Sequence, residues 1–194
     1  MDDSSAVRDD SVVFLGDSIT AAADWQSWFP GRSVHNLGVG GDTSDDVIAR
    51  LDAVVALAPG LVALLIGTND FGTRLSVEHL VRNIEYIMVS LRRELPGARL
   101  LVESIMPRGR EFAAQIQDAN RHLRQFAPGI NAHFLDLWPA LALDDGEIDP
   151  EFSDDRLHLT PAGYRAWLSE LQPALERLEQ APPMSRPIGI IRAE

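Results

Sequence analysis

Residues 61–70, with the sequence LVALLIGTND, join an uninterrupted apolar run to a short polar turn. The run covers 61–66 and has no polar position on either face of an extended chain. Parallel strands are covered on both faces and read as continuous apolar runs, whereas half-exposed antiparallel strands alternate apolar with polar residues. The stretch therefore predicts a central strand of a parallel sheet, with the polar turn at its carboxyl end.

Strand-like and helix-like segments alternate on both sides of this stretch. Four more short runs are predicted as strands, at 12–15, 33–37, 99–103 and 132–136. Apolar residues three or four positions apart predict helices at 19–29, 76–95, 110–127 and 160–178, with a shorter helix after Thr43. Strands that alternate with helices form a parallel sheet with helices on both faces, so the sequence predicts an α/β fold.

Polar and proline residues mark the ends of the predicted helices. Ser76 and Thr160 are predicted N-caps, and Pro161 suits the first position of the last helix. Pro173 lies inside that helix and predicts a kink or a break, because proline lacks the N–H group that a helix needs.

The length of 194 residues and an ordinary composition predict a single domain over residues 1–180. Ala181-Pro182-Pro183 is typical of a linker, so residues 181–194 are predicted to form a C-terminal tail, disordered or docked on a neighbour. No apolar run approaches the roughly 20 residues of a transmembrane helix, and the acidic residues 1–10 are unlike a signal peptide. We therefore expect a cytoplasmic protein without stable membrane insertion.

Charge and cysteine content exclude several classes of function. The chain has 17 Lys and Arg against 29 Asp and Glu, a net charge of −12 at pH 7. Because such a surface repels phosphate backbones, a nucleic-acid partner is not expected. The absence of cysteine excludes disulfide scaffolds, thiolate metal sites and cysteine nucleophiles. The acidic run at 144–149 lacks the pattern of a calcium loop and is interpreted as a solvated loop, so no metal is implied.

Four short polar segments are expected to meet at one edge of the sheet. They are GDS at 16–18, GGD at 40–42, GTND at 67–70 and DRLH at 155–158. The first three follow predicted strands, and the carboxyl edge of a parallel sheet is where such folds bind ligands. The fourth follows the last strand and can return to the same edge.

Ser18 is the candidate nucleophile. It lies at the entrance to a predicted helix, where backbone N–H groups and the helix dipole favour the negative charge that forms when a serine oxygen attacks a carbonyl. The alternative is that Ser18 only caps the helix, which is a common role of serine.

His158 is the candidate base, and Asp155 is the candidate partner that orients it. A neutral imidazole can accept the serine proton at pH 7, and a carboxylate three residues earlier can reach the ring and fix its tautomer. The alternatives are that the adjacent Asp154 serves instead, or that the two side chains form a solvated surface pair. The other histidines lie in strand or helix patterns and are interpreted as structural or exposed: His35, His79, His122 and His133.

Asn69 and the glycines at 40–41 are candidate donors to an oxyanion. A side-chain amide can stabilise the developing negative charge, and a flexible glycine loop can turn a backbone N–H toward the same point. Both features have a structural alternative, because asparagine and glycine pairs are also frequent in turns. The glycines match neither the dinucleotide-binding pattern nor the P-loop.

The ordered set GDS, GGD, GTND and DxxH resembles the SGNH hydrolases, the compact branch of the GDSL-type esterases and lipases. The resemblance spans about residues 12–178 and extends to NLGVGGDT at 36–43, MPRG at 106–109 and LHLT at 157–160. It looks most like the subgroup of the intracellular platelet-activating-factor acetylhydrolase catalytic subunits. The resemblance implies a three-layer α/β/α sandwich around a flavodoxin-like, five-stranded parallel sheet.

The same resemblance implies the roles of the site residues. Ser18, Asp155 and His158 would be the catalytic residues, and the oxyanion hole would comprise the Ser18 N–H, the Gly41 N–H and Asn69. Gly41 rather than Gly40 takes the glycine role because it immediately precedes Asp42. Ile19 stands where the family name has leucine, which is a conservative change, and no cofactor is implied.

Together these features predict a serine ester hydrolase that acts through an acyl-enzyme. The domain is too short for a large lid, which favours acetyl or other short-chain esters as the small-molecule substrates. Two alternatives stay open, a thioesterase or lysophospholipase of the same fold and a non-catalytic binding or scaffold module. The sequence leaves open whether the chain forms a homo-oligomer.

Overall fold

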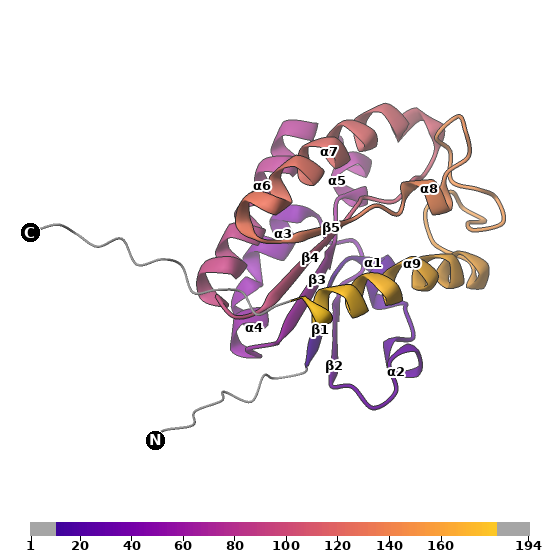
Figure 1. Ribbon diagram of the computed structural model, residues 1–194. Coiled ribbons are helices and arrows are strands. Elements are labelled where there is room, and N and C mark those ends of the chain that lie inside the picture. The colour runs from indigo at the N-terminus through magenta and orange to yellow at the C-terminus, as the bar shows by residue number, and fades with distance from the viewer. Residues whose placement is uncertain (1–10, 182–194) are drawn as a thin grey trace, which may run out of the picture.

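Five parallel strands form the centre of the computed structural model, which describes residues 11–181 (Figure 1). The strands are β1 (Val12–Gly16), β2 (Val34–Gly38), β3 (Leu61–Leu65), β4 (Arg99–Glu103) and β5 (His133–Leu135). Their order in the sheet is β2-β1-β3-β4-β5, and each neighbouring pair is parallel. This is the order of flavodoxin-like folds, so the predicted fold class is confirmed.

The two faces of the sheet are covered by different helices (Figure 1). One layer is built from α3 (Ser44–Ala49), α4 (Leu51–Ala56), α5 (Thr68–Gly72), α6 (Val77–Glu94) and α7 (Ala113–Phe126). The other layer is built from α1 (Ser18–Ala21), α2 (Trp25–Trp28), α8 (Trp138–Leu141) and α9 (Pro161–Gln180). Two 3₁₀ turns, Arg110–Phe112 and Ala127–Ile130, flank α7.

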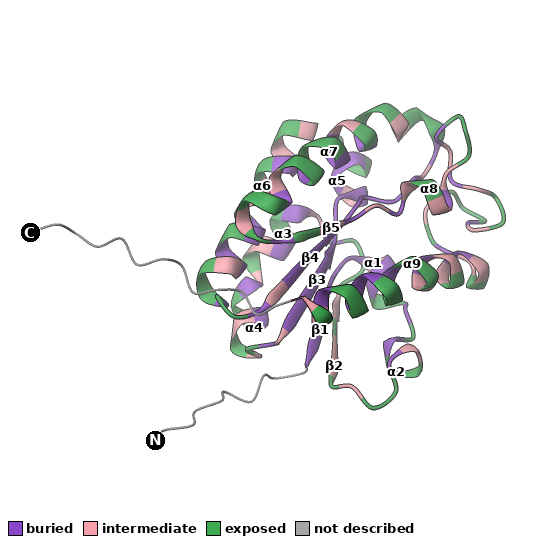
Figure 2. Cartoon of the chain, viewed as in Figure 1, coloured by how far each residue is buried: buried purple, intermediate pink, exposed green. Residues whose placement is uncertain are grey.

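The protein has one core on each face of the sheet. Successive residues of a strand pack into these two cores in turn, because their side chains point to opposite faces. In β1, Val13 and Leu15 belong to the core under α6 and α7, whereas Val12 and Phe14 belong to the core under α9. Every residue of β1 and β3 is buried (Figure 2). Burial on both faces explains why these strands read as continuous apolar runs.

The predicted caps of the two longest helices are confirmed. Ser76 precedes α6 and its hydroxyl accepts a hydrogen bond from the His79 N–H at 3.1 Å. Thr160 precedes α9 in the same way, with its hydroxyl 3.2 Å from the Gly163 nitrogen, and Pro161 takes the first helical position. Ser76 and Thr160 therefore satisfy N–H groups that have no partner inside the helix.

Local turns divide two helical regions of the chain, and one helix prediction is wrong in extent. The predicted helix over 19–29 is two one-turn helices, α1 and α2, and Asp24 starts the second by accepting a hydrogen bond from the Ser27 N–H. The shorter helix predicted after Thr43 is α3, and a turn at Arg50, which has a ψ of 16°, separates it from α4. In both places a local turn overrides a continuous apolar spacing, which periodicity alone cannot show.

Pro173 does not break the last helix, because α9 runs through it from Pro161 to Gln180. The proline is exposed, whereas Leu171 and Leu175 on either side of it are buried. Packing of the buried face against the sheet thus keeps the helix continuous, while the carbonyl left without a partner lies on the solvent side.

The predicted tail lies outside the described residues, except for Ala181. The Ala181 carbonyl accepts a hydrogen bond from Nη2 of Arg99 at 2.9 Å. Within residues 11–181, none of the helices has the length and apolar character required to span a bilayer.

Candidate active site

Ser18 follows β1 directly and is the first residue of the one-turn helix α1. The cap of this helix is Asp17, whose carboxylate accepts a hydrogen bond from the Ile19 N–H at 2.9 Å. The alternative in which Ser18 is the cap is therefore wrong, and its hydroxyl is available for other contacts. Burial raises the pKa of Asp17 to about 6, against the opposing effects of the hydrogen bond from the Ile19 N–H and of the electrostatic interaction with His158.

Three side chains from other parts of the chain bind the carbonyl groups of α1. The Tyr164 hydroxyl donates to the Ile19 carbonyl at 2.9 Å, the Trp25 indole donates to Thr20 at 2.9 Å, and the Asn36 amide donates to Ala21 at 3.0 Å. A single helical turn is unstable by itself and depends on such contacts. The position of Ser18 is therefore fixed by β2, α2 and α9 together.

The aromatic residues after Ser18 belong mainly to the core. Trp25 is 3% exposed and stacks on Phe14 with the ring centroids 3.5 Å apart. Phe29 is also buried, and Trp28 packs partly buried against the same cluster. These aromatic side chains therefore serve mainly in core packing.

Ser18, His158 and Asp155 form a chain of hydrogen-bonding contacts. Oγ of Ser18 lies 3.1 Å from Nε2 of His158, although the two residues are 140 positions apart in the sequence. Nδ1 of the same ring lies 2.7 Å from Oδ2 of Asp155. The adjacent Asp154 is exposed, and the contact to the imidazole comes from Asp155.

The surroundings of Asp155 determine which nitrogen of His158 carries the proton. The hydrogen bond to the imidazole, with further bonds from the backbone N–H groups of Leu157 and His158, lowers the pKa of Asp155 to about 2. An ionised carboxylate can only accept hydrogen bonds, so Nδ1 must be the donor. The lone pair of Nε2 then faces the Ser18 hydroxyl, an arrangement that can take up the serine proton.

The loop that carries Asp155 and His158 is held by an ion-pair network. Arg156, between them, has a φ of 65°, a left-handed conformation that is uncommon for a residue other than glycine. Its guanidinium binds Glu111 at 2.8 Å and Glu147 at 2.9 Å. Glu147 also binds Arg110, so part of the acidic run that we interpreted as solvated contacts the loop of Asp155 and His158 instead.

Gly41 and Asn69 lie on two neighbouring segments at the same edge of the sheet. Gly41 has a φ of 86°, which favours glycine because a side chain is strained there. Asn69 lies in the first turn of α5, and its Nδ2 donates to the Asp42 carbonyl at 2.9 Å. One amide hydrogen is thus used to orient the side chain, which leaves the second for a ligand.

Comparison with known families agrees with this arrangement. The profile of the GDSL-like lipase/acylhydrolase family matches residues 14–166, which include most of the sheet and all four polar segments. The chain belongs to this family. It is accordingly a hydrolase of the esterase and acylhydrolase type.

Several known proteins match the chain over most of its length. The platelet-activating factor acetylhydrolase IB subunit alpha1 of Bos taurus is 29% identical over 182 residues, which cover 88% of this chain and 77% of the relative. A GDSL-like lipase from Bacteroides thetaiotaomicron superposes with a TM-score of 0.76 at 22% identity, covering 87% of this chain and 88% of its own. An acetyl-xylooligosaccharide esterase from Geobacillus Stearmophilus superposes with a TM-score of 0.71 at 19% identity, covering 92% and 98%.

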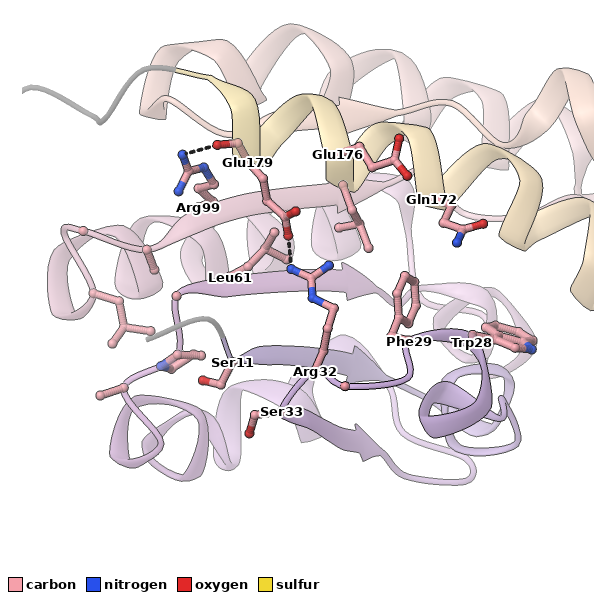
Figure 3. Close-up of a pocket in the computed structure, with 18 of the residues that line it drawn as sticks. Ser11, Trp28, Phe29, Arg32, Ser33, Leu61, Arg99, Gln172, Glu176 and Glu179 are labelled. Carbon is pink, nitrogen blue, oxygen red and sulfur yellow. Dashed lines mark hydrogen bonds and ion pairs between the residues drawn. The ribbon is translucent and has the colours of Figure 1, made fainter. Parts of the chain in front are cut away.

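A separate cavity of about 910 Å³ lies at the opposite edge of the sheet in this GDSL-like fold (Figure 3). Ser11, Leu61 and Arg99, at the amino ends of the strands, contribute to its lining. Arg32 in the cavity is paired with Glu179, and Arg99 binds the Glu179 carbonyl at 2.8 Å (Figure 3). This cavity is therefore remote from Ser18, and its arginines are bound by α9.

The remaining histidines stay outside the site. His79 pairs with Asp45 at 2.8 Å on the exposed side of α6, His35 is half-buried in β2, and His122 and His133 are exposed. Among residues 11–181 no group of acidic and histidine side chains has the arrangement of a metal site. Sequence reasoning missed Arg50, Tyr164 and Glu147, because each acts through contacts with segments distant in the chain.

Proposed function

We propose that the protein hydrolyses acetyl or other short-chain esters through an acyl-enzyme on Ser18. The observation that carries the proposal is the Ser18–His158–Asp155 chain, in which an ionised carboxylate sets the tautomer that the base needs. A binding module has no need of this order of donors and acceptors, so an enzyme is the better interpretation.

The reaction starts when Nε2 of His158 takes the proton of the Ser18 hydroxyl as Oγ attacks the ester carbonyl. The carbonyl oxygen becomes an oxyanion, which the N–H groups of Ser18 and Gly41 and the amide of Asn69 stabilise. The imidazolium then returns its proton to the departing alcohol, which leaves the acyl group on Oγ. Water, deprotonated by His158, attacks the acyl-enzyme and releases the carboxylic acid with regeneration of Ser18.

Exposure of the site supports a short acyl group. The side chains of His158 and Asp155 are 52% and 54% exposed. Burying each methylene of an acyl chain contributes about 0.8 kcal/mol, but only where apolar surface is available to cover it. In the four polar segments and their immediate neighbours, the accessible large apolar side chains are Val39, which is exposed, and the partly buried Leu157. The names of two relatives, an acetylhydrolase and an acetyl-sugar esterase, support the same class.

A series of nitrophenyl esters of increasing chain length tests the substrate class. We expect kcat/KM to be highest for acyl groups of two to four carbons and to fall at least about tenfold by eight carbons, because added methylenes find little apolar cover. A maximum at eight carbons or more would contradict the short-chain assignment. Matched thioesters in the same series would show whether kcat/KM depends on an oxygen or a sulfur as the leaving atom.

An organophosphonate probe tests the nucleophile separately. We expect one phosphonyl group on Ser18, located by mass spectrometry of the labelled peptide, and no labelling of a Ser18→Ala variant. A folded wild-type protein that remains unlabelled, or a variant that labels equally, would contradict the proposed nucleophile.

The neighbouring glycines provide a matched pair for the oxyanion loop. A Gly41→Ala substitution adds a Cβ with nothing within 4 Å, so its effect comes from the left-handed backbone, which costs about 1–2 kcal/mol for an L-residue. We expect the loop to shift and kcat to fall about tenfold or more, because the donor leaves its place. Kinetics and thermal unfolding would be measured for both this variant and Gly40→Ala.

Gly40→Ala is the control, since Gly40 has no left-handed φ and its Cβ would meet only the Ser18 Cβ, at 4.0 Å. We expect it to keep its stability and to affect KM more than kcat. Equal losses of kcat in the two variants would argue against Gly41 as the specific donor.

A further inference from the structure

Arg50 lies at the junction of α3 and α4 and binds two segments of the site at once. Its Nε donates to Oδ2 of Asp42 at 2.7 Å, and its Nη2 donates to the Gly16 carbonyl at 2.9 Å. The Arg50 side chain is 23% exposed and that of Asp42 12%, so the pair is largely shielded from solvent. A charged hydrogen bond in such surroundings is stronger and better defined in geometry than a surface ion pair.

Each partner of Arg50 is next to a proposed oxyanion donor. Gly16 ends β1 two residues before Ser18, and its carbonyl also accepts a hydrogen bond from the Val39 N–H at 3.0 Å. Asp42 directly follows Gly41, and its carbonyl is the acceptor that orients the Asn69 amide. The two contacts of the Arg50 guanidinium therefore connect it to the segments that position all three donors.

The loop that carries Gly41 needs such an anchor. Its residues Val39, Gly40 and Gly41 are exposed, and the two glycines have no side chain that could fix them. The far end of the loop is held by Asp70, whose carboxylate accepts hydrogen bonds from the N–H and hydroxyl groups of Ser44. At the near end the buried Asp42 side chain is the anchor, and Arg50 is its partner.

Arg50 also offsets a local excess of negative charge. Asp42 and Asp70 both act to raise the pKa of Asp17, so each lies close enough to Asp17 to repel its negative charge. The guanidinium lies against Asp42 and thereby compensates part of this negative charge.

We infer that Arg50 is a positioning residue that holds the three oxyanion donors in register. This inference rests on the proposed function of Ser18, Gly41 and Asn69. Donors stabilise a transition state only if they are held in place before the charge develops, and displacements of about 0.5 Å already reduce their effect. Arg50 contributes no atom to the reaction and acts through Gly16 and Asp42.

The test compares Arg50→Ala and Arg50→Lys with Arg92→Ala. Arg92 is a matched control, because its guanidinium also binds backbone carbonyls, those of Ala98, Ile130 and Asn131, but at the opposite edge of the sheet. Steady-state kinetics with an acetyl ester, thermal unfolding and the affinity for a trifluoromethyl ketone, which forms a tetrahedral oxyanion on the serine, would be measured for each.

We expect Arg50→Ala to lower kcat about 100-fold with KM changed less than about threefold, because the lost stabilisation belongs to the transition state. The affinity for the ketone should fall by a similar factor. Arg50→Lys keeps one of the two contacts, so its kcat should lie between those of the wild type and Arg50→Ala. Arg92→Ala should lower the unfolding temperature while kcat stays within about twofold of wild type.

Unchanged kcat in Arg50→Ala, or an equal loss in Arg92→Ala, would overturn the inference. If Arg50→Ala does not fold, Asp42→Asn decides instead, since it weakens the contact and keeps the backbone. A tenfold loss of kcat in Asp42→Asn supports the inference, and wild-type kcat overturns it. Failure of the proposed function has a different signature, namely a Ser18→Ala variant that hydrolyses the ester as fast as wild type.

Discussion

A His158→Ala variant is expected to release acetate from an alkyl acetate with a kcat on the order of 10⁵-fold below that of the wild type. Nε2 of His158, 3.1 Å from Oγ, is the acceptor of the proton that the attacking hydroxyl must lose. Without it the serine stays protonated at neutral pH, and only binding and the oxyanion donors contribute to catalysis. The measurement is acetate release at saturating substrate, with thermal unfolding to show that the variant is folded.

Replacement of Asp155, the carboxylate partner of His158, should lower kcat less than replacement of His158 does. Asp155→Asn is expected to lower kcat about 10⁴-fold, because an amide in place of the carboxylate favours the wrong tautomer of His158. Asp154→Asn is the matched control, since that carboxylate is exposed and the imidazole is bound by Asp155.

Because Ser18, His158 and Asp155 act as a unit, a Ser18→Ala/His158→Ala double variant should be no slower than either single variant. A His158→Ala variant that keeps more than about 1% of wild-type kcat would contradict the role of the base.

The strands and long helices of this protein could be predicted because each is buried in a regular pattern. The run at 61–66 has apolar residues on both faces and is the central strand β3, and the stripe at 76–95 is the helix α6. The short helices could not be predicted in this way. The division of 19–29 into α1 and α2 depends on Asp24 as a cap and on contacts from Tyr164 and Asn36, and these contacts exist only in the folded chain.

In the candidate site too, residues in recognisable local segments could be predicted, whereas residues that act through distant contacts could not. Ser18, Asn69 and His158 could be selected because each follows a strand or precedes a helix in a recognisable segment. Arg50 carried no such signal, since its partners Gly16 and Asp42 are 34 and 8 positions away. The network around Arg156 was missed for the same reason, because Glu111 and Glu147 come from two other loops.

Glu103, the last residue of β4, is the largest departure from the apolar pattern of the strands. It is 2% exposed and lies opposite Trp167, whose indole Nε1 donates to Oε2 at 2.6 Å. Leu101, two positions earlier in the strand, belongs to the core under α9, and Glu103 shares its face. Burial raises the pKa of Glu103 from 4.5 to about 8, although the hydrogen bond from Trp167 lowers it. Burial therefore favours the protonated form of Glu103 in the folded protein.

A Glu103→Gln variant is consequently expected to change how stability depends on pH. Between pH 4.5 and 8 the unfolded chain has lost the Glu103 proton and the folded chain has kept it, so the wild type loses stability as the pH rises. The slope is about 1.4 kcal/mol per pH unit, which amounts to a difference on the order of 5 kcal/mol over the whole window. Glutamine keeps the acceptor for Trp167 and has no proton to lose, so this part of the slope should disappear. The measurement is the free energy of unfolding in urea at pH 5, 6, 7 and 8 for both proteins.

The slope is the informative quantity because the absolute stability of Glu103→Gln also contains the cost of burying a second amide hydrogen, about 1–3 kcal/mol if it finds no acceptor. That cost is the same at every pH and cancels in the comparison. Glu170→Gln, at an exposed position of the same helix as Trp167, should leave the wild-type slope unchanged. Trp167→Phe removes the donor that favours the ionised form, so it should extend the loss of stability to higher pH. Parallel curves for the wild type and Glu103→Gln would mean that Glu103 ionises at the same pH in the folded and the unfolded chain. That result would contradict the raised pKa of the buried carboxyl group.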